Sequence, residues 1–177
     1  PEGTDLSSVR LILNGAEPVS ASLCEDFLTA MAPFGLQRTS MFPVYGLAEA
    51  TVGVTIGTPG NAYQTEAVDR HSVTIGQPWK SVPPTDEDAV IFVKVGRPIN
   101  DVSLRIVDDA DQELPSGSVG HIQLKGGSVT QGIYQDPETT ADLFASDNWL
   151  RTGDCGALID DELVVTGRQK DLIIVNG

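Results

Sequence analysis

Apolar residues at the start of the chain first form a short run and then recur with the spacing of a helix. The run Val9–Leu13 stops at Asn14-Gly15, which is typical of a buried strand. Ser22–Glu25 has the pattern of a capping box, and apolar residues then recur at helical spacing over Leu23–Met31. Met41–Tyr45 is a second extended apolar stretch. A strand, a helix and a strand in this order predict one parallel βαβ unit.

The rest of the chain shows less helical spacing and more alternation. Periodicity fades over Thr58–Thr85, where prolines and polar residues predict a long connection with little regular structure. Val102–Val107 alternates, and Val119–Leu124 does so after an acidic turn, so both stretches predict strands. Asp136–Phe144 opens with Asp-Pro, which predicts a short capped helix. Asp160–Glu162 separates two apolar runs and predicts a hairpin.

Composition limits the class of function. The 177 residues carry a formal net charge of −14, which argues against nucleic acid as a partner because a phosphate backbone needs a basic face. A small phosphorylated ligand, held by a few donors and a metal ion, remains compatible with this charge. No apolar run reaches the roughly 20 residues that span a bilayer, and the start lacks signal-peptide features. With only Cys24 and Cys155, we expect reduced thiols in a cytoplasmic protein.

Two segments of the predicted α/β part carry residue types suited to nucleotide binding. Asn14–Glu17 follows a strand and precedes a helix, where a glycine lets the backbone approach a flat ligand and hydrogen-bond a base edge. In Tyr45–Glu49, the tyrosine offers a ring face for stacking and the glutamate a hard oxygen for Mg²⁺. Taken alone, these segments are more simply explained as an ordinary turn and as a core tyrosine beside a solvated glutamate.

Two later segments offer charged side chains. Trp149–Asp154 places a carboxylate after a glycine turn, and one carboxylate can accept hydrogen bonds from both hydroxyls of a ribose. An Asx-turn is the more common role for such an aspartate. Gly167–Asp171 contains a guanidinium able to reach a phosphate or a ribose, although a surface salt bridge is more frequent. The sequence has no P-loop, HExxH, GxSxG or GxGxxG motif, and His71 and His121 stand alone.

The joint order of five short motifs resembles the adenylate-forming superfamily. That superfamily includes acyl-CoA synthetases, luciferases, peptide-synthetase adenylation domains and fatty acyl-AMP ligases. The resemblance covers nearly the whole chain, and its strength lies in the shared order of the motifs. They are, in chain order, Asn14-Gly15-Ala16-Glu17-Pro18, Tyr45-Gly46-Leu47-Ala48-Glu49-Ala50, Gly96-Arg97-Pro98, Arg151-Thr152-Gly153-Asp154 and Gly167-Arg168-Gln169-Lys170-Asp171.

The resemblance implies a nucleotide-binding role for most of these motifs. The backbone around Gly15-Ala16 would line the adenine, and Tyr45 would stack on it. Asp154 would bind the ribose hydroxyls, and Arg168 would contact the ribose or the phosphates. The residues implied in ATP or AMP binding are Asn14, Gly15, Ala16, Tyr45, Gly46, Leu47, Ala48, Asp154 and Arg168.

Metal binding and domain movement are implied for two further residues. Glu49 would be the catalytic residue that helps hold Mg²⁺, so the implied cofactors are ATP and Mg²⁺. Lys170 would lie at the hinge about which a small C-terminal domain rotates between half-reactions, with Asp171 as the alternative assignment. Many family members carry Thr where this chain has Ala48, so a hydroxyl contact to the α-phosphate would be missing.

The implied architecture is α/β plus β, as part of the large N-terminal domain of an adenylate-forming enzyme. Residues 1–95 would form the end of a Rossmann-like α/β layer, with a long insertion at about 58–95. Residues 96–168 would form a small distorted β-barrel, and residues 169–177 a hinge that leads to a C-terminal domain. The family's phosphate loop and catalytic lysine fall outside this sequence, so we expect a central fragment without useful activity of its own.

Among the branches of the superfamily, the motifs are most similar to those of fatty acyl-AMP ligases, and segment 58–95 resembles the insertion that marks this branch. The resemblance implies that a fatty or other carboxylic acid reacts with ATP to give acyl-AMP and pyrophosphate. The acyl group would then pass to the thiol of an acyl carrier protein. Two alternatives stay open: an acyl-CoA synthetase that uses coenzyme A as acceptor, and a degenerate adenylation-like module that binds without catalysis. Retention of Tyr45, Glu49, Asp154 and Arg168 together argues against degeneration.

Overall fold

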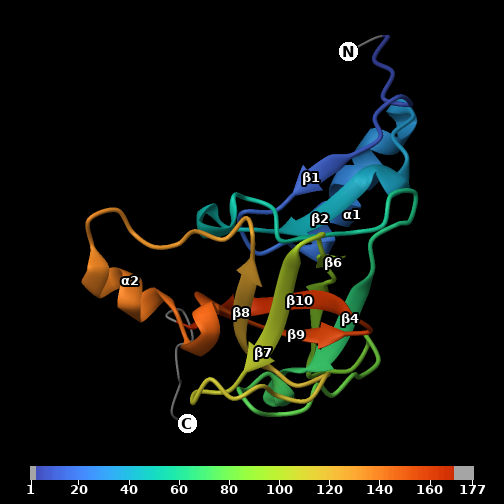
Figure 1. The fold of residues 1–177 in the computed structure, drawn as a ribbon. Coiled ribbons are helices and arrows are strands. Elements are labelled where there is room, and N and C mark those ends of the chain that lie inside the picture. Colours follow the sequence, from blue (N-terminus) through green and yellow to red (C-terminus); the bar gives the residue numbers. More distant parts are fainter. Residues whose placement is uncertain (1–2, 170–177) are drawn as a thin grey trace.

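The computed structural model describes residues 3–169, and these residues arrange ten strands in three sheets (Figure 1). The strands are β1 (Ile12–Asn14), β2 (Met41–Tyr45), β3 (Thr55–Ile56), β4 (Thr65–Asp69), β5 (Ala89–Val93), β6 (Arg97–Pro98), β7 (Val102–Val107), β8 (Gly120–Gly126), β9 (Leu150–Ile159) and β10 (Glu162–Arg168). The α-helices are α1 (Ala21–Met31) and α2 (Pro137–Leu143). Short 3₁₀ turns lie at Ala32–Phe34, Arg38–Ser40, Ala48–Ala50, Arg70–Ser72 and Ser146–Asn148.

The predicted βαβ unit is confirmed. Strands β1 and β2 pair in parallel, and α1 forms the crossover between them. The helix begins two residues earlier than the capping-box pattern predicts, because Ser20 has extended backbone and its Oγ accepts a 3.3 Å hydrogen bond from the Leu23 amide. Ser22 lies inside the helix, and its hydroxyl is 3.0 Å from that of Ser20. The cap is therefore Ser20 alone.

The prediction of little regular structure over Thr58–Thr85 is wrong in part. Strand β4 lies within this stretch and pairs antiparallel with β5 along its whole length. Ala67 and Val68 are both buried although they are adjacent, so β4 lacks the alternation by which a half-buried strand is recognised. Its ladder hydrogen bonds come from β5, a partner that is distant in the sequence.

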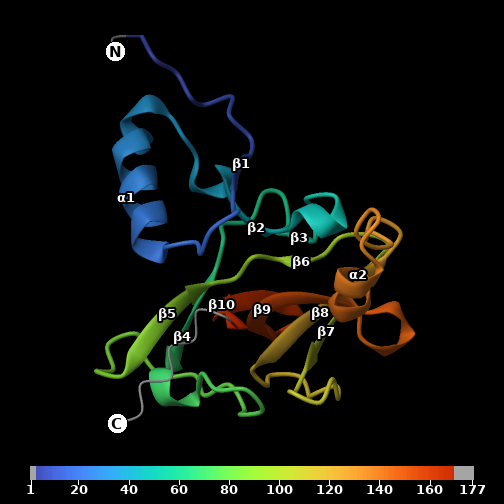
Figure 2. The ribbon, with the colours of Figure 1, turned by 90° about the vertical axis from the view of Figure 1, so that its left-hand side faces the viewer.

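The β-rich part, predicted as a small distorted β-barrel, is over the described residues an antiparallel sheet that does not close. Within residues 3–169, strands β10, β9, β8 and β7 form an antiparallel sheet whose outer strands do not pair with each other (Figure 2). A barrel requires a continuous ladder around its circumference. Here β10 instead faces the end of the β4–β5 hairpin through a single bridge between Val164 and Lys94. The α/β plus β fold class is nonetheless confirmed, whereas the domain boundaries stay a prediction.

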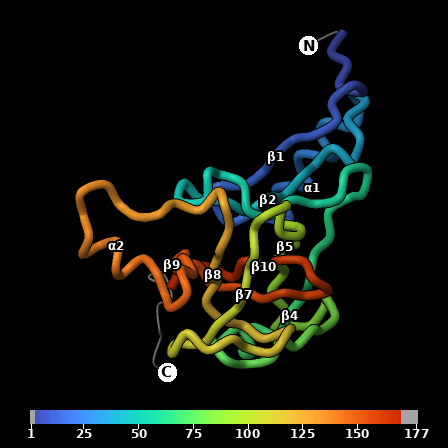
Figure 3. The backbone as a smooth tube through the Cα atoms, viewed as in Figure 1, coloured from blue at the N-terminus to red at the C-terminus, as the bar shows by residue number. Residues whose placement is uncertain are grey.

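One core joins the two parts of the molecule. Tyr45 and Val54 from the α/β side pack with strand residues of the β7–β10 sheet, among them Ile122 and Leu163. A smaller cluster under α1 contains Cys24, Leu28, Leu36 and Met41. Figure 3 shows that the orange segment after β8 extends away from this core before it returns through α2 to β9. None of the helices described over residues 3–169 has the length and apolarity required to span a membrane.

A buried lysine connects the β4–β5 hairpin to the β9–β10 hairpin. The Lys94 side chain is 4% exposed, and its Nζ lies 3.0 Å from Glu66 Oε1 and 3.2 Å from Asp160 Oδ2. Glu162 Oε2 is 3.9 Å away. Burial opposes the charge, but the hydrogen bonds with Glu66 and Asp160 outweigh it and hold the pKa of Lys94 above its ordinary value. Lys94 therefore links the two hairpins through ion pairs made by a buried lysine.

Replacing Lys94 with methionine should lower the free energy of unfolding by about 2 kcal/mol, because Glu66, Asp160 and Glu162 then lose the cation that they share. Chemical denaturation of the full-length protein measures this loss. It should persist at neutral pH and shrink only above the pKa of an unfolded lysine, about 10.4, since the pKa of Lys94 is raised. The matched control is Lys80→Met on the same hairpin, where the lysine is 66% exposed and pairs with Asp69. An equal loss of stability in both variants would contradict the claim that Lys94 links the two hairpins more strongly than an exposed ion pair does.

Candidate functional site

Three of the predicted site residues meet where the α/β part joins the β7–β10 sheet. Tyr45, at the end of β2, donates its hydroxyl to Asp154 Oδ2 over 2.7 Å. Arg168 Nε lies 3.3 Å from Asp154 Oδ1. Asp154 and Arg168 face each other as paired residues of β9 and β10. The fold thus gathers a phenol, a carboxylate and a guanidinium from three strands.

Asp154 projects from an irregularity in β9 and not from a turn. On β8, His121 pairs with Cys155 and Gln123 with Arg151, so three residues of β9 lie opposite Ile122. This extra length is a β-bulge, which bends the strand and changes the direction of its side chains. The glycine turn predicted before Asp154 is therefore wrong. Gly153 is the sequence signal that could have indicated the bulge, because an isolated glycine inside a strand often marks one.

The bulge is stabilised by its own side chains and backbone. Gly153 has φ of 76°, a region that favours glycine. The Thr152 hydroxyl donates to the Ile122 carbonyl over 2.8 Å and accepts from the Asp154 amide over 3.0 Å. These contacts fix the backbone directly beside the carboxylate. Sequence reasoning quoted Thr152 within its motif but gave it no role.

The charges of the cluster suit a hydroxylated ligand. The Asp154 side chain is 12% exposed and accepts two contacts here, whereas a carboxylate has about four acceptor positions. Burial, together with the negative charge of Asp154, raises the pKa of Tyr45, so its hydroxyl remains a donor. Arg168 is 71% exposed, which leaves most of its guanidinium available. Tyr45 is only 9% exposed, and its stacking on adenine stays a prediction.

The first predicted segment lies at the same sheet edge as Tyr45. Because β1 and β2 are parallel, their carboxyl ends point the same way, and Gly15-Ala16 follows β1 beside the end of β2. A Cβ on Gly15 would be 2.7 Å from the Val44 carbonyl oxygen, so only glycine allows this approach. The Asn14 side chain is directed to the helix, where Nδ2 donates to Cys24 Sγ over 3.3 Å. The side-chain amide nitrogen of Asn14 is therefore engaged within the protein.

The motif after Tyr45 forms a tight turn that is tied to a distant loop. Leu47 precedes the 3₁₀ turn Ala48–Ala50, and Ala48 itself is exposed. The Glu49 carbonyl accepts a 2.7 Å hydrogen bond from the Thr130 amide, and the Thr51 hydroxyl donates to the Ser128 carbonyl. The loop containing Ser128 and Thr130 thus positions the turn. Sequence reasoning missed this loop, because backbone contacts between distant segments leave no residue pattern.

Glu49 is a single candidate ligand for a metal ion. None of the hydrogen bonds or ion pairs among residues 3–169 uses its carboxylate, and these residues contain no group of three or more His, Cys, Asp or Glu able to hold an ion. Mg²⁺ in nucleotide sites often takes one or two carboxylates and completes its shell with phosphates and water. One free carboxylate fits this mode. Lys170, predicted as the hinge, and its alternative Asp171 lie outside the described residues.

Known proteins share both the sequence and the fold of this chain. Residues 1–134 match the family described as AMP-binding enzyme. A 4-hydroxyphenylalkanoate adenylyltransferase of Mycobacterium marinum is 37% identical over 99% of this chain and 30% of its own length. A long-chain-fatty-acid–AMP ligase of Mycolicibacterium smegmatis is 34% identical over 98% of this chain and 30% of its own length.

A solved structure has the same fold over almost the whole chain, and it is also similar in sequence. It is a fatty acyl-adenylate ligase from Legionella pneumophila in complex with acyl adenylate and pyrophosphate, with a TM-score of 0.89 and 39% identity. The similarity covers 98% of this chain and 31% of that chain. The chain therefore spans about a third of the length of the proteins that it matches.

Proposed function

Because the chain belongs to the AMP-binding enzyme family, we propose that the protein activates a fatty acid or a related carboxylic acid with ATP to give acyl-AMP and pyrophosphate. The observation that carries the proposal is the cluster of Tyr45, Asp154 and Arg168. It offers a shielded carboxylate with free acceptor positions beside an exposed guanidinium, as the ribose and phosphates of a nucleotide require. The similarity to an acyl-adenylate complex supports the same reaction class.

In the proposed reaction, a carboxylate oxygen of the acid attacks the α-phosphorus of ATP and the bond to pyrophosphate breaks. Asp154 would hold the ribose hydroxyls, and Arg168 would approach the ribose or the phosphates. The backbone of Gly15-Ala16 would line the adenine. Glu49 would hold Mg²⁺, which supplies positive charge to the phosphates. These residues orient the reactants and offset charge, and none acts as a nucleophile.

Exchange of labelled pyrophosphate into ATP tests acyl-AMP formation without reference to the acceptor. We expect exchange by the full-length protein that depends on a fatty acid and on Mg²⁺ but not on coenzyme A. The same exchange with an aromatic alkanoate would extend the substrate class. Absence of exchange with any carboxylate would favour the alternative of a binding module without catalysis.

We further propose that the acyl group passes to the phosphopantetheine thiol of a carrier protein in the cytoplasm. The segment from Thr58 to Val95 supports this acceptor, because it folds as a β4–β5 hairpin that Lys94 fixes to the β9–β10 hairpin. Strand β10 leads directly toward the predicted hinge. A hairpin fixed at this position can bias the orientation of a following domain toward adenylation. A bias of about 2.7 kcal/mol lowers the population of the other orientation about a hundredfold.

Shortening the hairpin should therefore raise the rate of coenzyme A acylation by up to about a hundredfold, with pyrophosphate exchange largely retained. A suitable variant replaces residues 74–85 with a short glycine–serine linker and keeps β4 and β5. The matched control, Pro83→Ala with Pro84→Ala, changes only exposed positions of the same connection. Coenzyme A and an acyl carrier protein are compared as acceptors. Efficient acyl-CoA formation by the unaltered protein would instead assign it to the acyl-CoA synthetases.

A further inference from the structure

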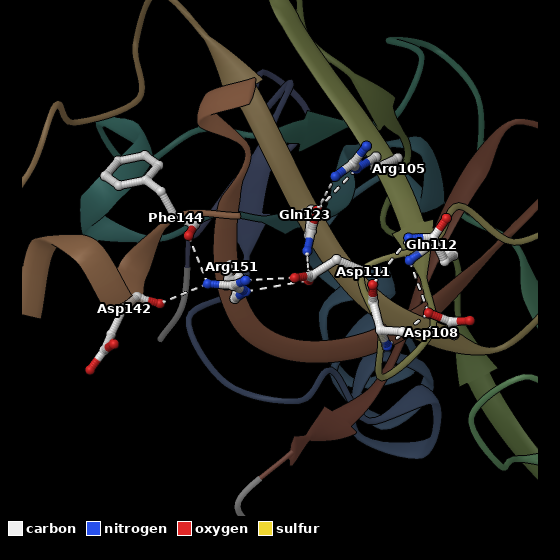
Figure 4. Close-up of polar contacts among 9 residues, drawn as sticks. Arg105, Asp108, Asp111, Gln112, Gln123, Asp142, Phe144 and Arg151 are labelled. Atoms are coloured by element: carbon white, nitrogen blue, oxygen red, sulfur yellow. Dashed lines mark hydrogen bonds and ion pairs between the residues drawn. The ribbon is translucent and has the colours of Figure 1, made fainter. Parts of the chain in front are cut away.

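Arg151 is the centre of a polar network at the start of β9 (Figure 4). Its Nη2 lies 2.5 Å from Asp111 Oδ2, and its Nε donates to Asp111 Oδ1 over 3.3 Å. Its Nη1 donates to the carbonyls of Phe144 and Asp142 over 2.7 and 3.1 Å. One guanidinium thus connects β9, the turn between β7 and β8, and the end of α2. Only a planar group with several donors can make these contacts together.

The partner of Arg151 is itself held in place. Gln123 is 1% exposed, and its Nε2 donates to Asp111 Oδ1 over 2.5 Å. Arg105 donates to the other end of Gln123 through Nη2 over 2.7 Å, and its guanidinium lies 4.4 Å from the centre of the Trp149 ring. The hydrogen bond from Arg151 is the main cause that lowers the pKa of Asp111. Consecutive hydrogen bonds therefore join Arg151, Asp111, Gln123 and Arg105, and Gln123 attaches this charged network to β8.

The network lies immediately before the bulge that carries Asp154. Arg151 is the last residue of β9 that pairs with β8 before the bulge, and its pairing partner is Gln123. Gln123 also holds Asp111, so backbone pairing and the side-chain network fix the same point of β9. Because side chains alternate along a strand, a slip of one residue here would turn Asp154 to the other face.

We propose that Arg151 is a positioning residue for the nucleotide, which keeps the Asp154 carboxylate directed at the ribose by fixing the start of the bulge. Arg151 itself does not contact the ligand and acts through the backbone. This inference rests on the proposed function, since it requires that Asp154 binds the ribose. The competing explanation is that Arg151 only fastens the end of α2 to the sheet.

Comparison of ATP with 2′-deoxy-ATP in the full-length protein separates these explanations. A residue that acts through the ribose contact changes the preference for ATP, measured as the ratio of kcat/KM values, whereas a loss of fold lowers both rates equally. We expect Arg151→Lys to lower this preference about tenfold, because one ammonium cannot replace the planar contacts to Asp111 and two carbonyls. Asp111→Asn should shift the preference in the same direction without any substitution in β9. It replaces Arg151→Lys as the test variant if Arg151→Lys fails to fold.

The matched control is Arg70→Lys, which leaves the preference unchanged. Arg70 pairs with Asp88 and donates to the carbonyls of Glu87 and Asp88, so its contacts are of the same kind but lie within the connection between β4 and β5. If Asp154→Ala abolishes the preference and Arg151→Lys retains it, the positioning role is wrong and the proposed function stands. If Asp154→Ala retains the preference, the ribose contact of Asp154 is wrong and the positioning role of Arg151 falls with it, whereas acyl-AMP formation is still decided by pyrophosphate exchange.

Discussion

Replacing Asp154 with alanine in the full-length protein should raise the KM for ATP by about tenfold to a hundredfold, equivalent to about 1–3 kcal/mol. The variant removes the proposed acceptor of the ribose hydroxyls from a position where the side chain is only 12% exposed. The hydroxyls would then be buried without a partner in the complex. Steady-state kinetics with varied ATP measures the effect, and Asp26→Ala on the exposed surface of α1 is the control.

The same variant also disturbs the fold, and this effect can be separated. Asp154→Ala leaves the buried Tyr45 hydroxyl without its acceptor, which by itself costs stability. Combining it with Tyr45→Phe removes the unpaired hydroxyl. The double variant should recover thermal stability but keep the high KM for ATP. Recovery of ATP affinity along with stability would mean that Asp154 serves the fold and not the ribose.

Replacing Gly46 with alanine should destabilise the protein by about 3 kcal/mol or more, which makes it the most damaging single change predicted here. A Cβ at this position would overlap the Val52 carbonyl oxygen. That oxygen belongs to the backbone of a turn closed by hydrogen bonds from the Val52 amide to Leu47 and from the Val54 amide to Tyr45. A shift of this turn would also disturb Tyr45, whose carbonyl accepts a hydrogen bond from the Val54 amide.

The control for this substitution lies in the same turn. A Cβ on Gly53 would have Ile99 Cδ1, at 3.8 Å, as its nearest neighbour, so Gly53→Ala should change the free energy of unfolding by less than about 1 kcal/mol. Urea denaturation of both variants measures the difference. Equal midpoints for Gly46→Ala and the unaltered protein would show that the close approach of Gly46 and Val52 is wrong.

The sequence predicts those parts of the fold that depend on neighbouring residues. Asp136 caps α2 as its position before Pro137 indicates, with Oδ1 accepting from the Thr139 amide over 3.0 Å. The hairpin at Asp160–Glu162 is also confirmed, since Asp160 and Asp161 both adopt the positive φ of a tight turn. Local chemistry determines both features. For this reason they can be identified without knowledge of the rest of the chain.

Features that depend on distant partners could not be predicted in the same way. Lys94 directly follows β5, and its burial as a charged group depends on Glu66 and on Asp160 from another hairpin. The contact between Tyr45 and Asp154 depends on a bulge opposite Ile122. The motif order identified the family, which the matches confirm. The nucleotide role of each residue within the site stays a prediction.

A structure of the full-length protein with a bound, non-hydrolysable acyl-adenylate analogue tests the central claim most directly. We predict that both ribose hydroxyls lie within hydrogen-bond distance, about 2.6–3.2 Å, of the Asp154 carboxylate, with Arg168 on the same side of the ligand. Tyr45 and Gly15 would then face the adenine. An adenylate bound elsewhere, with Asp154 still in contact only with Tyr45 and Arg168, would contradict the assignment of this cluster as the nucleotide site.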